Sequence, residues 1–151
     1  MNRLAPYACI LLCTLFSTAG FSQPGVTKPK QFSNFPSKIT CTDDELAKAF
    51  ITPAGQSVSL AFSDNFRFQG TVLGNNYKYS NLQSVVINSP VFNNSVFAIS
   101  KRINSDNSFT YVGRIINTNY FDGFELTKDA SGVYQLTKIE IDRMIQPCAK
   151  Q

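Results

Sequence analysis

Residues 56–62 read Gln-Ser-Val-Ser-Leu-Ala-Phe, and this stretch decides the fold class. The apolar side chains of Val58, Leu60 and Phe62 recur at every second position, which is the period of a β-strand that buries one face. Residues 63–65, Ser-Asp-Asn, are turn formers, so the chain is expected to reverse and return as a second strand.

The same alternation of strand and turn continues along most of the chain. The expected strands are residues 56–62, 66–72, 77–79, 82–88, 96–103, 109–117, 121–126 and 133–136. Their connections leave no room for the helical crossovers that parallel strands need. The sequence therefore predicts a mainly β fold, an antiparallel meander of about seven strands that forms a small barrel or a sandwich.

A short N-terminal helix is expected to precede these strands. Thr42 and Glu45 have the spacing of a capping box, in which the Thr42 hydroxyl accepts from the Glu45 amide and the Glu45 carboxylate reaches back to the Thr42 amide. The predicted helix covers residues 43–50 and ends at the Thr-Pro-Ala-Gly sequence of residues 52–55.

The C-terminal residues permit two predictions. Ile141, Met144 and Ile145 recur at helical spacing before Pro147, which indicates a short terminal helix. The alternative is a last strand that runs from residue 133 to residue 141.

The first residues of the chain resemble an export signal. Arg3 gives a positive flank, residues 8–16 are an almost unbroken apolar run, and small residues follow it. We expect cleavage after Ser22, with cleavage after Ala19 as the alternative. No later segment approaches the ~20 apolar residues of a membrane-spanning helix, so a secreted or periplasmic protein without a transmembrane segment is expected.

The mature chain is expected to begin with a leader and to continue as one domain. Residues 23–38 contain three prolines and three lysines and are expected to be flexible or extended, although Phe32 and Phe35 could pack on the surface of the domain. Residues 39–151 then form the single domain.

Cysteine usage predicts a clasp across this domain. Cys41 and Cys148 remain after the signal peptide is removed, one near each end of the folded region. In an oxidising compartment they are expected to form a disulfide. A lipid anchor on Cys13 is the rival for the leader, but Ile-Leu-Leu at residues 10–12 does not resemble a lipobox.

The composition argues against several kinds of chemistry. The chain has no histidine and no tryptophan, so histidine-based triads and zinc sites cannot be assembled. Asn104, Asp106 and Ser108 alternate as calcium ligands do, but without the glycine and terminal glutamate of an EF-hand loop they favour a hairpin tip. We expect no metal and no cofactor. The net charge of +4 is scattered, which argues against a nucleic-acid partner.

Carboxylates are the remaining route to catalysis. Glycoside hydrolysis needs two carboxyl groups at a set separation. The candidates are Asp64, Asp106, Asp122, Glu125 and Asp129. A small carboxylate-dependent hydrolase that acts on glycans is therefore one alternative function, although aspartates in turns commonly bond their own backbone.

The leading hypothesis is an exported, non-catalytic binding module for a protein or a glycan surface. Its candidate binding residues are Lys101, Arg102, Tyr111 and Arg114, which mix cations with an aromatic ring. A second alternative is a β-barrel that carries a small apolar ligand, suggested by the 13 phenylalanines, although these rings are expected to fill the core.

The alternation assigns these candidates to faces of the sheet. Tyr111 and Arg114 are expected on opposite faces of one strand, and Arg102 from the paired strand is expected on the face of Arg114. If Glu125 or Asp122 from the next strand pairs with Arg114, the role of Arg114 is structural.

Overall fold

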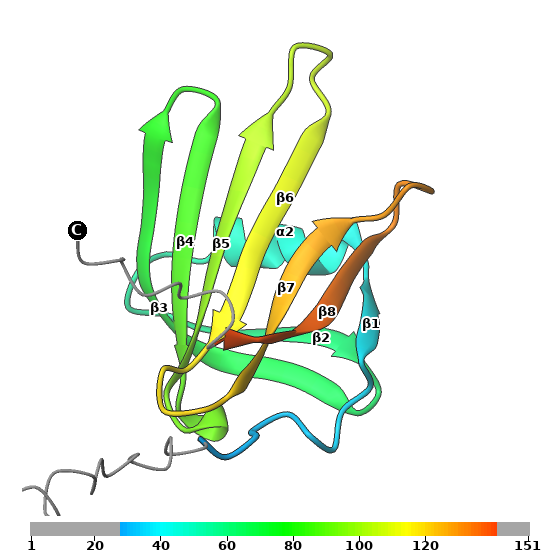
Figure 1. The fold of residues 1–151 in the computed structure, drawn as a ribbon. Coiled ribbons are helices and arrows are strands. Elements are labelled where there is room, and N and C mark those ends of the chain that lie inside the picture. Colours follow the sequence, from blue (N-terminus) through cyan, green and yellow to red (C-terminus); the bar gives the residue numbers. More distant parts are fainter. Residues whose placement is uncertain (1–27, 142–151) are drawn as a thin grey trace, which may run out of the picture.

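One antiparallel sheet of eight strands organises the protein, as a computed structural model that describes residues 28–141 shows (Figure 1). The strands are β1 (Lys38–Cys41), β2 (Ser57–Ser63), β3 (Phe66–Tyr79), β4 (Leu82–Ser89), β5 (Ser95–Ile103), β6 (Phe109–Ile116), β7 (Asp122–Lys128) and β8 (Tyr134–Glu140). A helix, α2 (Asp43–Ile51), follows β1, and a 3-10 turn, η1 (Pro90–Phe92), joins β4 to β5. The predicted antiparallel, mainly β fold is confirmed.

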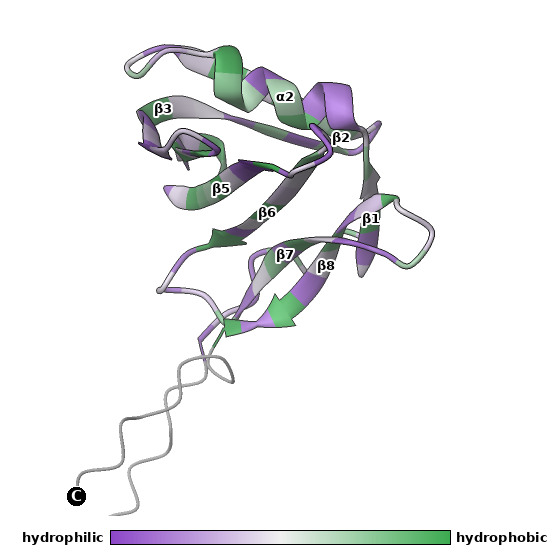
Figure 2. Cartoon of the chain, turned by 90° about the horizontal axis from the view of Figure 1, so that it is seen from above, coloured by the Kyte–Doolittle hydropathy of each residue, from purple (hydrophilic) through white to green (hydrophobic). Residues whose placement is uncertain are grey.

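The sheet curls into a nearly closed barrel (Figure 2). Its strand order is β1-β8-β7-β6-β5-β4-β3-β2, so β2 to β8 follow one another as a meander and β1 adds to the far edge beside β8. The edge strands β1 and β2 approach each other without pairing in the described residues. The barrel expectation therefore describes the architecture better than the sandwich expectation.

Two strands differ from the sequence prediction. β1 was not among the expected strands, and its first residue, Lys38, was assigned to the leader. β3 runs unbroken through residues 74–76, where a turn was expected, because register shifts between Val72 and Gly74 and between Tyr77 and Tyr79 absorb the irregular sequence. β3 is consequently 14 residues long.

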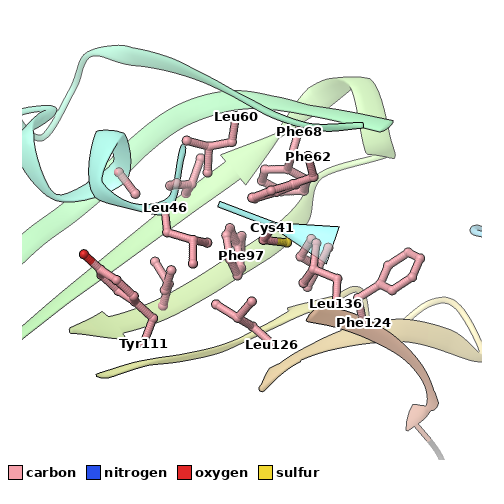
Figure 3. Packing of buried hydrophobic residues seen from close by; sticks show 14 of the residues in the cluster. Cys41, Leu46, Leu60, Phe62, Phe68, Phe97, Tyr111, Phe124, Leu126 and Leu136 are labelled. Carbon is pink, nitrogen blue, oxygen red and sulfur yellow. The ribbon is translucent and has the colours of Figure 1, made fainter. Parts of the chain in front are cut away.

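Aromatic side chains fill the inside of the barrel (Figure 3). The fully buried rings are those of Phe32, Phe66, Phe68, Phe97, Phe124 and Tyr134. Phe32 comes from the leader, whose backbone is held because the Gln31 and Phe32 amides donate to the two carboxylate oxygens of Asp122, at 2.6 and 3.1 Å. The described part of the leader is therefore anchored in the core.

Helix α2 covers one end of the sheet. Thr42 caps it as predicted, with the Glu45 amide 3.3 Å from the Thr42 hydroxyl oxygen. The Glu45 carboxylate does not return to Thr42, which corrects the capping-box prediction. It accepts instead from the Ala61 amide on the free edge of β2, at 2.5 Å, and from the Lys48 ammonium group.

The C-terminal prediction is resolved only in part. β8 continues to Glu140, so a last strand is present. The expected helical residues Met144 and Ile145 lie outside the described residues, as do Cys148 and the signal peptide of residues 1–22. Within residues 28–141, no helix is long and apolar enough to cross a membrane.

Candidate functional site

The outer face of the sheet carries a row of side chains that crosses five strands. Gly74 of β3 pairs with Val86 of β4, Val86 with Ala98 of β5, Ala98 with Arg114 of β6, and Arg114 with Glu125 of β7. Because side chains alternate between the faces of a strand, residues paired in this way share one face. The row therefore begins with small and aliphatic residues and ends in an ion pair.

A second row lies beside the first. It consists of Asn76, Ser84, Ser100 and Val112, on β3 to β6 in turn. The hydroxyl oxygens of Ser84 and Ser100 are 2.9 Å apart and hydrogen-bond to each other. Each hydroxyl therefore has a hydrogen-bond partner that is itself a small side chain. The centre of the outer face is consequently built from small residues.

Larger side chains close the two ends of this region. At one end, Val96 pairs with Ile116. At the other end, Leu82 pairs with Arg102, and Tyr79 lies beside Leu82. The distance from Val96 to Arg102 along β5 is six residues, or about 20 Å.

The small central residues and larger margins leave a hollow of about 600 Å³ and an adjoining one of about 410 Å³, both of which are lined by Ser100 and Val112. We call the two together the outer-face groove. Val86, Ala98 and Val112 form its floor with the Ser84–Ser100 pair, and Leu82, Val96 and Ile116 form its apolar ends. Val112 is 54% exposed, so apolar surface here is open to a partner.

Arg114 lies on one wall of the groove. Its Nε and Nη2 atoms donate to Glu125 Oε1 at 2.9 and 2.8 Å. The structural pairing anticipated for Arg114 is therefore present. Arg102 of β5 pairs with Thr110, which is four residues from Arg114 on β6. Arg102 has no ion pair with any residue between 28 and 141, so its guanidinium is available to an acidic group.

Lys101 and Tyr111 do not belong to this surface, which corrects the grouping of four binding residues. The two residues pair across β5 and β6 on the inner face. The Lys101 ammonium lies 5.0 Å from the ring centre of Phe50 and 5.4 Å from that of Phe109. Tyr111 is buried, and burial, with smaller contributions from nearby acidic groups, raises its pKa. Both residues stabilise the contact between sheet and helix.

The candidate carboxylates act mainly on their own backbone. Asp106 Oδ1 accepts from the amide and hydroxyl of Ser108, and these bonds lower the pKa of the Asp106 carboxyl group. Asp129 accepts in the same way from Ser131, which lowers its pKa. The residue 104–108 segment is the hairpin tip that the sequence predicted.

The structure does bring Asp122 beside another carboxylate. Its cross-strand partner is Glu140, which the sequence analysis did not consider, and both border a hollow of about 300 Å³ with Lys30 and Lys138. The Asp122 carboxylate already accepts hydrogen bonds from the Gln31 and Phe32 amides, so it holds the leader against the domain. Within the described chain, no group of three or more acidic, cysteine or histidine side chains could hold a metal.

Cys41 is a buried thiol on the inner face of β1 (Figure 3). Burial raises its pKa to about 12, partly opposed by a hydrogen bond from the Leu136 backbone. Its predicted partner Cys148 lies outside the described residues, so the disulfide stays a prediction.

Sequence reasoning missed the groove itself. Its small residues are scattered along the sequence at positions 74, 84, 98 and 100, and only the strand register brings them together. The available signal was the aliphatic character of outward positions 86, 96 and 112, where an exposed strand face would ordinarily carry polar residues.

Comparison with known proteins finds no family model, no curated protein and no solved structure that matches this chain.

Proposed function

We propose that this protein is an exported, non-catalytic binding module whose outer-face groove takes an apolar segment of a protein partner. The observation that carries the proposal is the aliphatic floor of the groove, which is open to solvent and bordered by Arg102, Arg114 and Tyr79. Contiguous apolar surface with a polar rim is typical of interaction sites.

The chemistry of the floor favours a protein over a glycan. Sugars commonly bind on flat aromatic rings, whereas the floor consists of aliphatic side chains, and Tyr79 borders only one end. A length of about 20 Å matches about six residues of an extended chain or about four turns of an α-helix. Arg102 would then meet an acidic residue of that segment.

The filled interior supports a binding module over a carrier of apolar ligands. Phe68 and Phe97 are fully buried in the barrel, with ring centres 5.7 Å apart, and occupy space that a carried ligand would need. The carboxylates engaged in turns and in the leader anchor likewise give a hydrolase no specific support.

Photo-crosslinking tests the groove directly. A photoreactive amino acid at position 98 of the full chain, expressed in its native host, is expected to attach to one protein through an apolar segment. A synthetic peptide of that segment should then bind the purified protein and lose binding to the Ala98→Arg variant. Position 133, an exposed valine outside the groove, is the matched control.

Three results would reject this function. They are equal labelling at positions 98 and 133, attachment to carbohydrate alone, and peptide binding that Ala98→Arg leaves unchanged. Attachment to carbohydrate would favour the glycan alternative.

The proposal also includes removal of the signal peptide and a disulfide between Cys41 and Cys148. The apolar run of residues 8–16 supports removal of residues 1–22, and two cysteines in the mature chain support a bond between Cys41 and Cys148. Mass spectrometry of the secreted or periplasmic protein tests both: the mass should correspond to residues 23–151 less two hydrogen atoms. Retention of the leader or two free thiols would contradict them.

A further inference from the structure

β3 extends well beyond the strand that covers its edge. β2 pairs with β3 only as far as Thr71, and the Gln56 carbonyl then accepts from the Val72 amide. Residues 73–79 continue as a strand that pairs with β4 alone, and no backbone hydrogen bond links them to any other described element. In Figure 1 this part of β3 is the outermost strand at the left of the sheet.

Large apolar side chains gather at this free edge. Leu73, Tyr77 and Tyr79 are 61, 69 and 70% exposed. Ile51, at the end of α2, is also exposed and lies beside the same edge, because the carbonyls of its neighbours Phe50 and Thr52 accept from the Asn75 side chain. These four are half of the eight large apolar residues most exposed in the described chain.

The chemistry of the edge defines its occupant. A free strand edge presents alternating amide and carbonyl groups at the spacing of a β-ladder, and another extended backbone satisfies them best. A purely apolar ligand would cover the tyrosines but leave the backbone groups without partners.

We propose that the β3 edge pairs with the same edge of a second copy of this chain, forming a two-fold dimer. Antiparallel pairing centred on Asn75 or Asn76 places each Lys78 opposite Val72 or Gly74 of the second copy, so the edge's cations are not juxtaposed. The same pairing brings Tyr77 opposite Leu73 or Asn75. It buries apolar surface that each copy leaves exposed.

The edge also limits the strength of this dimer. The register shifts at its two ends confine regular pairing to residues 74–77, and both bulges and an edge lysine weaken pairing with other chains. The contact is therefore small, and the dimer is expected to be weak, with a Kd from about 1 μM to about 1 mM. The edge borders the outer-face groove at Gly74, Asn76 and Tyr79, but its backbone pairing does not require the groove to be occupied.

Sedimentation velocity of the mature protein across that concentration range tests the dimer. We expect a concentration-dependent shift from monomer to dimer, with slower amide exchange at residues 74–77 as the dimer forms. Tyr77→Lys is expected to raise the dimer Kd at least about tenfold, because it places a charge in the paired edge. Val91→Lys changes an equally exposed valine on η1 and should leave the Kd unchanged.

Leu73→Lys gives a second test at the other end of the edge and should also weaken the dimer. A protein that stays monomeric at all these concentrations overturns the proposal. So does a dimer that Tyr77→Lys and Val91→Lys affect equally, which would assign the interface to another surface. Neither result would bear on partner binding in the groove.

Discussion

The two faces of β4, β5 and β6 differ in the size of their apolar side chains. The inner face places Ile87, Phe97 and Ile115 in the core, and all three are fully buried. The outer face is also rich in apolar residues, but Val86 and Ala98 are small and lie beside a pair of serines. Large inner residues fill the barrel, while small outer residues leave a groove. The same strands thus provide both stability and a surface for binding.

Among the variants that test this difference between the two faces, Phe97→Ala is expected to lower stability the most. The Phe97 ring is fully buried and lies 5.7 Å from the Phe68 ring and 6.1 Å from the Phe62 ring, measured between centres. Phe97→Ala should lower the free energy of unfolding by about 3–5 kcal/mol, because it leaves a cavity in the core. Urea denaturation measures this change. Val112→Ala on the outer face should stay within about 0.5 kcal/mol, and equal losses would show that both faces belong to one core.

A second test compares two glycines. A Cβ atom on Gly113 would lie 2.7 Å from the Ala98 carbonyl oxygen and 3.0 Å from the Phe97 ring, so Gly113→Ala should cost about 1–3 kcal/mol of stability. Gly74 borders the groove, where the nearest atom is a flexible Asn76 side chain at 3.3 Å. Gly74→Ala should therefore cost less, as thermal denaturation would measure. The reverse order would contradict the packing described for the two faces.

The contact between α2 and β2 gives a pH-dependent test. Burial acts to raise the pKa of Glu45, but hydrogen bonds from Lys48 and Ala61 outweigh it, and the pKa is lowered. This contribution to stability is present above the pKa of the unfolded chain, about 4.3, and is lost as pH falls through the folded pKa. Glu45→Gln should cost about 1–2 kcal/mol at pH 7 and flatten the loss of stability below pH about 4.3, measured by urea denaturation at each pH. An unchanged pH profile would show that the Glu45 carboxylate does not stabilise this contact.

The smallest effect is expected at the wall of the groove. The Arg114 side chain is half exposed, so its ion pair with Glu125 should contribute about 0–1 kcal/mol. Arg114→Ala should therefore leave the thermal midpoint nearly unchanged. Because Arg114 also lines the groove, the substitution should weaken capture of a partner at position 98. A large loss of stability with normal capture would make this residue purely structural.

The sequence predicted those features that depend on neighbours along the chain. Alternation identified the strands and placed Tyr111 and Arg114 on opposite faces, and residues 104–108 formed the expected hairpin tip. It did not establish that the face of Tyr111 is buried under α2, because that depends on where the helix packs. Nor did it identify the unbroken β3, since a bulge and a turn use similar residues.

The pairing of β1 with β8 has a consequence for the timing of folding. Ile39 lies opposite Leu136, so residues near the start of the described chain find their partners only in its last strand. Contacts between such distant residues form slowly because a long loop must close first. The barrel cannot be completed until β8 has emerged, whether from the ribosome or from a translocation channel. This delay fits the proposed export, because a chain that folds late stays unfolded while most of it passes through a translocation channel.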